Sequence, residues 1–456
     1  MTFFSSPDLK DMSGLETITS SVQDVLIDSL QFTPKPGASY ITARRDTRFF
    51  AAGSDSYQPD TGVKVIRINL TGAPQEWLDP ASLRISFDLT NRSSTAVVQP
   101  ITGPWAFFSR VSIRVLGTLV EDLQQYGLTY QVFSNGLTEE ARQREMDMSF
   151  GGIIDSNQRE QPEHIPQSET RTVTMNLLSG LFSGQNKHLW LSAMGPVTIE
   201  LELADASVPC KLGEHSPAVV ATTTTAAVAA VQRTNEWKIS NVFAMGSVVD
   251  LSPDLINAYT GHLESGKSLP YSFGTYATVQ HAIQRPADFS VNQSRAFSRL
   301  NTIFAVFSQP RDLETSEVSY FSGKCGDAID EHTMRQANDN LETYISLGGT
   351  RYPQYPTQKL AHHRLYYVSA LGKLNSDVHT PGTKMQAWRH DKMVLGWDME
   401  KAHSGSGAAF SGTSTRNGDL LTLFCKNGPA DANKLTLINH FEVIARISAA
   451  GCDLLD

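Results

Sequence analysis

Apolar and polar residues alternate in short runs along most of the chain from residue 64 onward. One run places Ile66, Ile68 and Leu70 between polar residues. Apolar residues at every second position predict a β-strand with one buried side and one solvent-facing side. Such half-buried strands are typical of antiparallel sheets, whereas strands of parallel sheets are apolar throughout. Similar runs predict strands at 83–89, 111–115, 173–177, 197–203, 237–251, 300–307, 393–397, 420–425 and 435–447.

The residues after Gly117 follow a different period. Their apolar positions are three or four apart, as on one face of an α-helix. The sequence therefore predicts that the strand at 111–115 turns at Gly117 and continues as an amphipathic helix. The apolar residues of this face are Leu119, Leu123, Tyr126, Tyr130 and Phe133.

Two more helices and two long loops are predicted. Ser252 and Pro253 begin one helix, because a serine can cap free backbone N–H groups and a proline fits the first helical turn. Gly266 is expected to end this helix. The other helix is expected at 358–371. Polar segments without a period are interpreted as loops, at 138–168 and 311–340.

The order of these elements divides the chain into two similar halves. Each half contains short alternating strands, a helix beside a strand and a long polar loop, which predicts an all-β fold of two antiparallel sandwiches, 63–210 and 235–456. Residues 1–62 contain many prolines and glycines and are predicted to be an N-terminal arm. The segment 211–234 is interpreted as a linker, because Ala218–Gln232 is a low-complexity run of small residues. A short apolar strand is the alternative for that run.

Composition and charge restrict the classes of function. The 456 residues are 40% hydrophobic, which is enough for packed cores. The net charge of −9 argues against a nucleic-acid binder with a basic surface. The four cysteines are scattered, so neither a disulfide framework nor a zinc knuckle is expected. We also expect no secretory signal and no membrane span.

One segment matches a nucleotide-binding motif letter for letter. The motif G-x-x-x-x-G-K-[ST] falls on Gly261, Gly266, Lys267 and Ser268. A working phosphate loop needs a buried strand before it and a helix after it, so that free N–H groups surround the phosphates. Here the predicted helix comes before the motif and a predicted strand follows. We therefore interpret the match as a chance similarity and expect no cofactor.

No other motif predicts catalysis or metal binding. His362 and His363 are neighbours on a predicted helix, where their side chains point about 100° apart and cannot hold one metal ion without other ligands. The serine-hydrolase elbow and the zinc-protease helix motif are both absent from the sequence. The carboxylates form no pair that a sequence can identify, although a pair assembled in space stays open.

The order of features resembles a known family. Residues 65–91 have the form of a hairpin around the turn Trp77-Leu78-Asp79-Pro80, and the strand-to-helix stretch follows. Together with the segments 235–259, 348–356 and 435–455, these features resemble double-jelly-roll major capsid proteins of icosahedral double-stranded DNA viruses. The similarity is greatest to those of polinton-like or algal viruses. It covers residues 40–456 and lies in the order of features, because no single motif is diagnostic.

The resemblance implies two tandem eight-stranded jelly rolls with flanking helices and long loops. It implies a major capsid protein without enzymatic activity, which trimerises into pseudo-hexameric capsomers that tile an icosahedral shell. Other implied partners are penton and minor capsid proteins, and an internal membrane or the genome through residues 1–62, where Lys35, Arg44, Arg45 and Arg48 lie. No sequence-specific nucleic-acid binding is expected. The location would be the virion, after synthesis in the host cytoplasm and assembly in the cytoplasm or nucleus.

In that family, helices after strands pack between rolls and between subunits. We therefore expect the helix after Gly117 to be a wedge between sandwiches, anchored by Leu123 and Tyr126. Two functions from other classes stay open. A two-domain β-sandwich glycoside or glycan hydrolase would need paired carboxylates in a cleft, and a carbohydrate-binding protein would need exposed aromatic platforms. The candidate residues for subunit contact are Leu119, Leu123, Tyr126 and Tyr130.

Overall fold

The computed structural model describes most of the chain from residue 40 onward, and residues 41–456 form one compact unit. The elements described below lie in that unit. No helix among the described residues is long and apolar enough to cross a membrane. The described residues are 40–60, 62–154, 160–216, 231–283, 288–308, 340–372, 381–383, 385, 388, 392–401, 411–416, 420–429 and 432–455.

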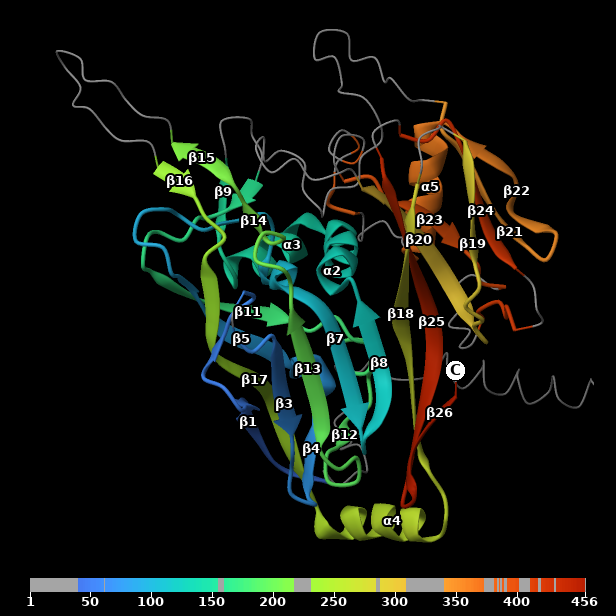
Figure 1. Ribbon diagram of the computed structural model, residues 1–456. Coiled ribbons are helices and arrows are strands. Elements are labelled where there is room, and N and C mark those ends of the chain that lie inside the picture. Colours follow the sequence, from blue (N-terminus) through green and yellow to red (C-terminus); the bar gives the residue numbers. More distant parts are fainter. Residues whose placement is uncertain are drawn as a thin grey trace, which may run out of the picture. The chain divides into compact units, whose positions relative to one another are not determined.

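The first half of this unit is a sandwich of antiparallel sheets (Figure 1). This half has eight main strands, which are named at the end of this paragraph. If they are numbered one to eight in chain order, the strands of one sheet lie side by side in the order six, three, eight, one. The other contains the second, seventh, fourth and fifth. This alternation between two sheets is the topology of a jelly roll. The eight strands are β1 (Ile41–Ala52), β3 (Val65–Leu70), β5 (Arg84–Asn91), β7 (Phe108–Val115), β8 (Thr118–Gln124), β11 (Thr170–Asn176), β13 (Val197–Leu203) and β17 (Trp237–Leu251).

The second half repeats the same strand order. One sheet runs β18-β25-β20-β23 and the other runs β19-β24-β21-β22, with β26 (Gly451–Leu455) added beside β25. The prediction of two tandem eight-stranded jelly rolls is therefore confirmed. The strands are β18 (Leu269–Ala282), β19 (Phe289–Gln293), β20 (Leu300–Ser308), β21 (Glu342–Leu347), β22 (Thr350–Gln358), β23 (Leu395–Asp398), β24 (Leu421–Lys426) and β25 (Lys434–Ser448).

Short strands supplement the first roll. Two of them, β4 and β12, pair with each other, and β2 and β4 also pair with β17. The remaining three pairs, β6 with β14, β9 with β10 and β15 with β16, form separate two-stranded sheets. These short strands are β2 (Ser56–Tyr57), β4 (Glu76–Leu78), β6 (Gln99–Pro100), β9 (Gly152–Ile154), β10 (Glu160–Pro162), β12 (Leu189–Trp190), β14 (Cys210–Lys211), β15 (Gly213–Ser216) and β16 (Val231–Arg233).

The boundary between the two rolls lies later in the chain than predicted. Strand β17 was expected to open the second sandwich at residue 235, but it is the eighth strand of the first roll and lies between β5 and β1. The chain passes to the second roll through helix α4 (Pro253–Glu264) and not through the segment 211–234. Residues 217–230, which contain most of the low-complexity run, lie outside the described residues.

The same pairing corrects the predicted arm. Residues 41–52 were assigned to an arm reaching residue 62, but they form β1, which pairs with β17 from Ile41↔Leu251 to Phe50↔Phe243. Nearly every side chain of β1 is exposed, so the strand is held by backbone hydrogen bonds and lacks the alternation that indicates a buried face. Its last two residues, Ala51 and Ala52, pair with β3 in the other sheet.

The stretch after Gly117 also differs from the prediction. Residues 118–124 form strand β8, and helix α2 (Tyr126–Asn135) begins only at Tyr126. The chain reverses at Leu116 and Gly117, both with positive φ, so that β7 and β8 form a hairpin. The register shifts at Val120, which places Leu119 opposite Arg114 on the outer side and Leu123 opposite Val111 on the inner side. A spacing of four fits both a helix and a strand, which explains why the pattern misled.

The other predicted helices are present. Helix α4 follows Ser252 as expected, although the serine side chain makes no capping bond, and helix α5 (Leu360–Ala370) lies within 358–371. The polar segment 138–168 is not all loop, because Thr138 caps helix α3 (Glu139–Asp147). Residues 311–339 of the other predicted loop lie outside the described residues. Short 3-10 helices span Pro80–Ser82 and Pro104–Phe107.

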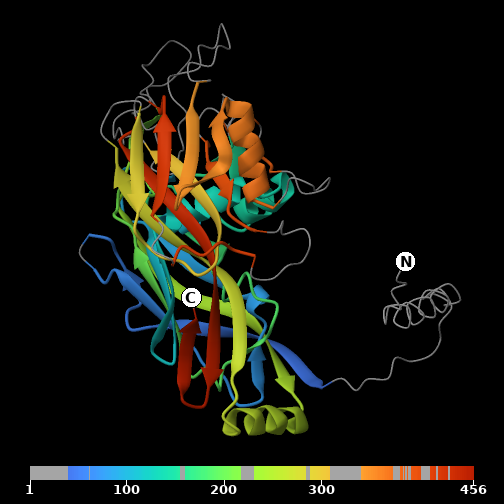
Figure 2. The same ribbon diagram turned by 90° about the vertical axis from the view of Figure 1, so that its right-hand side faces the viewer.

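The two rolls lie side by side and share one hydrophobic core (Figure 1). Helix α4 crosses from one roll to the other at the end opposite α2 and α5, as the side view in Figure 2 also shows. A separate small cluster supports it, in which the rings of Trp77 and Trp190 are stacked with centroids 5.2 Å apart. Tyr259 of α4 packs on this pair, with its ring 5.0 Å from that of Trp77.

Truncation tests whether β1 is part of the first roll. A chain that begins at residue 40 retains β1, and we expect its thermal unfolding to match that of the full chain. A chain that begins at residue 53 lacks β1 and leaves one edge of β17 without its partner. We expect that this chain no longer unfolds in one cooperative transition. Circular dichroism during heating measures both. Equal unfolding curves for the two truncations would show that β1 is dispensable.

The junction between the two jelly rolls as a candidate functional site

The nucleotide-binding motif lies at the end of α4. Gly261 is within the helix, Gly266 adopts a positive φ of 81° just after it, and β18 begins at Leu269, directly after Lys267 and Ser268. The helix therefore precedes the motif and a strand follows it. A phosphate loop has the reverse order, so this geometry offers no helix N-terminus to a phosphate.

The neighbouring histidines of α5 have separate structural roles. His362 is exposed, whereas His363 is buried. The Nδ1 of His363 lies 2.8 Å from the Lys359 carbonyl oxygen, and its Nε2 lies 3.0 Å from the Thr343 hydroxyl on β21. The contact with Thr343 holds α5 to the sheet, and the contact with Lys359 lies within the first turn of the helix. Among the described residues, no group of three or more His, Cys, Asp or Glu side chains could hold a metal ion.

Three of the four candidate residues for subunit contact are buried within the chain itself. Leu123 is 1% exposed and faces the core from β8. The Tyr126 hydroxyl accepts a hydrogen bond from the Leu178 N–H, and the ring of Tyr130 stacks on Trp105 with centroids 4.3 Å apart. Leu119, at 36% exposed, is the one candidate of the four that a second subunit can reach. The prediction fails for the others because their helical face is satisfied inside the first roll.

Helix α2 nevertheless lies between the two rolls. Its Phe133 ring is 4.5 Å from the ring of Tyr276 on β18 and 5.4 Å from that of Phe304 on β20, both in the second roll. The wedge between sandwiches therefore exists within one chain. The contact of α2 with the second roll is made by Phe133, near the end of the helix. Tyr126 of α2 and Leu123 of β8 are instead buried inside the first roll.

A buried carboxylate on β8 holds the loop that meets the second roll. Glu121 is 2% exposed and accepts hydrogen bonds from the Ser179 hydroxyl, from the Gly180 N–H at 2.9 Å and from the Leu181 N–H at 3.3 Å. Burial raises the pKa of the Glu121 carboxyl, and these hydrogen bonds oppose that effect because they favour the charged form. The carboxylate thus fixes the backbone of residues 179–184, which we call the junction loop.

The junction loop approaches the backbone of the second roll at Gly180. A Cβ atom at Gly180 would lie 1.9 Å from the Gly274 carbonyl oxygen on β18, so no larger residue fits there. Hydrogen bonds flank this contact: the Gln185 Nε2 donates to the Ser272 carbonyl over 3.2 Å, and the Thr278 hydroxyl donates to the Gln124 carbonyl over 2.8 Å. The two rolls are therefore joined by an approach that only glycine permits.

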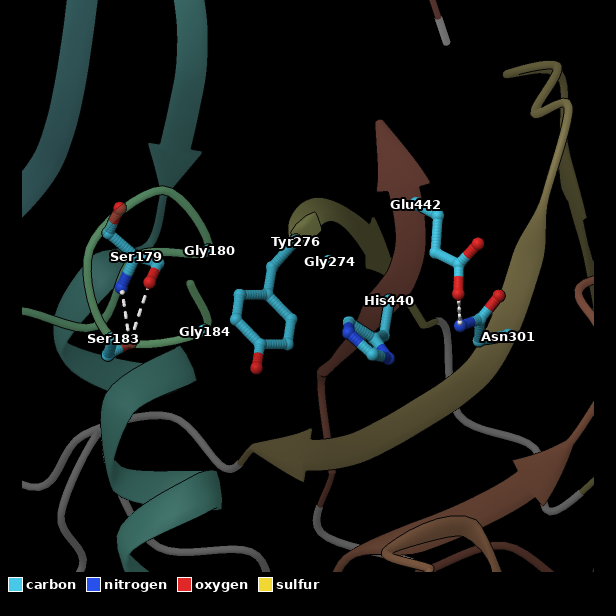
Figure 3. Close-up of a pocket in the computed structure, with 9 residues that line it drawn as sticks. All are labelled: Ser179, Gly180, Ser183, Gly184, Gly274, Tyr276, Asn301, His440 and Glu442. Atoms are coloured by element: carbon cyan, nitrogen blue, oxygen red, sulfur yellow. Dashed lines mark hydrogen bonds between the residues drawn. The ribbon is translucent and has the colours of Figure 1, made fainter. Parts of the chain in front are cut away.

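Behind Gly274 lies a polar pocket of about 330 Å³ that is lined from both rolls (Figure 3). His440 of β25 stacks on Tyr276 with ring centroids 5.0 Å apart, and a Cβ at Gly274 would lie 2.3 Å from its Nε2. Burial lowers the pKa of His440 to about 4. Beside it, the Asn301 amide donates to the Glu442 carboxylate over 3.1 Å. The side chains of this pocket stack and hydrogen-bond with one another where the two rolls meet.

Sequence reasoning missed Glu121, Gly180, Gly274 and His440. One local signal was present, because an isolated glycine inside the alternating strand 269–282 indicates a close approach of another backbone. Glu121 and His440 carry no such signal, since each looks like an ordinary polar residue of a half-buried strand.

Comparison with known proteins identifies the fold. No protein-family model and no curated protein matches the sequence. Among solved structures, VP54 of PBCV-1, fitted into a reconstruction of the virophage Sputnik, has a TM-score of 0.60 at 10% identity over 93% of this chain and 100% of its own. The Faustovirus major capsid protein has a TM-score of 0.59 at 8% identity over 94% of both chains. This chain has the double-jelly-roll fold of these major capsid proteins.

Enlarging Gly180 tests the joint between the rolls. Gly180→Ala places a methyl group against the Gly274 carbonyl, and we expect a loss of about 1–3 kcal/mol or more in the free energy of unfolding. Gly261→Ala is the matched control, because a Cβ there has open space in helix α4 and should stabilise by about 0.5–1 kcal/mol. Chemical denaturation measures both. A neutral Gly180→Ala would show that the contact is loose.

Leucines on the two faces of β8 should respond differently to truncation. Leu123→Ala removes a fully buried side chain and should cost about 2–5 kcal/mol of unfolding free energy. Leu119→Ala changes an exposed side chain and should stay within about 0.5 kcal/mol of the parent. Equal losses in denaturant titrations would contradict the register shift at Val120.

Proposed function

We propose that this chain is the major capsid protein of an icosahedral double-stranded DNA virus. The observation that carries the proposal is the likeness in fold to VP54 of PBCV-1 and to the Faustovirus major capsid protein along at least 93% of the chain. The repeated topology supports it. Two rolls with the same strand order, side by side, let one chain present two similar contact surfaces to its neighbours.

In the proposed assembly, three copies form a capsomer. Three copies would contribute six rolls, and a ring of six similar rolls approaches sixfold symmetry while the subunits obey threefold symmetry. Permanent contacts of this kind usually bury more than about 2,000 Å². Such capsomers would tile the shell, so that the protein resides in the virion after synthesis in the cytoplasm and assembly in the cytoplasm or nucleus of the host.

One exposed apolar patch is a candidate for subunit contact. Leu116 and Leu119 are 40% and 36% exposed at the β7–β8 hairpin, and Leu455 of β26 is 39% exposed. The Thr118 hydroxyl donates to the Cys452 carbonyl over 3.2 Å, which brings the hairpin and β26 together. We call Leu116, Leu119 and Leu455 the hairpin patch. The outer face of the same sheet is polar, with Arg67 and Arg114 both paired to Glu200.

Further partners in this proposal are penton and minor capsid proteins, and an internal membrane or the genome through the N-terminal region. The basic residues of β1 already have partners within the chain, so they are less available for such contacts. Arg45 pairs with Glu76, Arg44 donates to the Ser247 hydroxyl, and Arg48 lies over the ring of Phe243. Lys35 lies outside the described residues.

A role as an enzyme has less support. A glycan hydrolase needs two carboxylates that face one cleft with oxygens available for substrate. At the junction, both oxygens of Glu121 accept hydrogen bonds from the junction loop, and one oxygen of Glu442 accepts from Asn301 within the second roll. We therefore propose a structural protein without catalytic activity.

Hydrodynamic mass and electron microscopy test the proposal. The purified protein should have three times the chain mass of 50.0 kDa and form flat, six-lobed particles. Leu119→Asp places a charge in the hairpin patch and should shift the protein toward monomer. Leu365→Asp, at another exposed leucine on α5, is the matched control. A stable monomer at micromolar concentration would contradict the trimer, and ATP hydrolysis that Lys267→Ala abolishes would contradict a purely structural role.

A further inference from the structure

A second cavity, of about 440 Å³, lies where helix α4 passes from the first roll to the second. Helix α4 crosses at the end of the rolls opposite α2 and α5 (Figure 2). Strands β4 and β17 of the first roll, helix α4, and strand β18 of the second roll all contribute to the lining. Pockets of this volume commonly bind small molecules, so the cavity is large enough for a ligand.

The walls of this cavity are apolar. Trp77 and Val249 belong to the small cluster that supports α4, and Tyr259 and Leu269 pack against that cluster. The rings of Trp77 and Tyr259 hold each other in place, with centroids 5.0 Å apart. Aromatic and aliphatic walls of this kind gain free energy when a hydrocarbon group covers them and displaces water. The cavity therefore favours a ligand with an apolar body.

The rim of the cavity carries a positive charge. Lys187 and His188 are exposed and Ile41 is 49% exposed, so these lining residues mark the side that is open to solvent. The Lys187 Nζ donates to the Pro270 carbonyl oxygen over 3.2 Å, and this neutral acceptor leaves its charge uncompensated. The ion pairs of the described residues do not include Lys187, and no carboxylate is among the described lining residues. The rim is therefore suited to an anionic group.

We propose that this cavity binds a medium-chain fatty acid, with the carboxylate at Lys187. The hydrocarbon chain lies against Trp77, Tyr259 and Leu269, and the carboxylate accepts from the Lys187 ammonium group at the exposed rim. This orientation buries the apolar part of the ligand and keeps its charge in contact with water and with a cation, so no unpaired charge is buried. The inference concerns a single chain and does not depend on the proposed shell function.

Quenching of tryptophan fluorescence in the full-length protein tests the proposal. The probe is undecanoic acid with bromine on its terminal carbon, kept below its critical micelle concentration, because bromine quenches tryptophan emission at close contact. The stacked rings of Trp77 and Trp190 lie at the cavity, so the acid should quench the emission saturably. Native mass spectrometry should show one acid per chain. Trp77→Phe keeps an aromatic ring in the wall and should lose a large part of the quenching while the bound acid is still detected.

Variants of the wall and of the rim test the two parts of the site separately. Leu269→Phe reduces the cavity and should weaken binding at least about tenfold. Ile41→Phe narrows the mouth at an exposed position and serves the same purpose if the first variant does not fold. Lys187→Glu reverses the charge at the rim and should weaken binding about fivefold, the upper range for an exposed ion pair. Lys434→Glu is the matched control, because Lys434 pairs with Ala282 at the far end of β18 from Leu269.

The choice of ligand completes the test. The alcohol of the same length, with the same bromine, should bind about fivefold more weakly than the acid, because it carries no charge for Lys187. The proposal is overturned if the acid does not quench, if the wall variants bind it as the parent does, or if the alcohol binds as tightly as the acid. Quenching by vesicles of a chain-brominated phospholipid, without quenching by the monomeric acid, also overturns it, because the surface is then a membrane contact.

Discussion

The backbone contact between Gly180 and Gly274 sets how closely the two jelly rolls approach. Each roll is a sandwich with its own open edges, and two sandwiches in one chain need a joint that is both close and specific. Glu121 fixes the junction loop on one side by accepting its N–H groups, and His440 fills the space that Gly274 leaves on the other. The position of Phe133 against Tyr276 depends on the same spacing.

The strands with a buried side were readable from the sequence, and the strands without one were not. Val65–Leu70 and Val197–Leu203 alternate cleanly because each lies with one side on the core. Strand β1 is exposed along most of its length, with Phe49 as its buried residue, and is held by backbone pairing, so its residues looked like an arm and its partner β17 was assigned to the wrong roll. The joint was hidden for a related reason. Glu121 and His440 come from strands 319 residues apart, and no local pattern reports on such a meeting.

The two rolls use equivalent helices for different purposes. In each roll a helix follows the fifth strand, α2 after β8 and α5 after β22. Helix α2 directs Phe133 at the other roll, whereas α5 lies on its own sheet, held by the bond between His363 and Thr343. A repeated topology has therefore acquired one helix that joins the halves and one that stabilises a single half. The helix that contacts the other roll is therefore the one that belongs to the first roll.

The position of β17 between β5 and β1 has a consequence for synthesis on the ribosome. Residue 41 pairs with residue 251, so about two hundred residues must emerge before the first roll can close. Until then β1 has only the two residues of β3 as a partner, and β5 carries an open edge beside Ile85 and Phe87. Until β17 is synthesised, the unpaired edges of β5 and β1 can accept any extended segment. Correct folding therefore requires that β17 of the same chain pairs with these edges before a strand from another copy does.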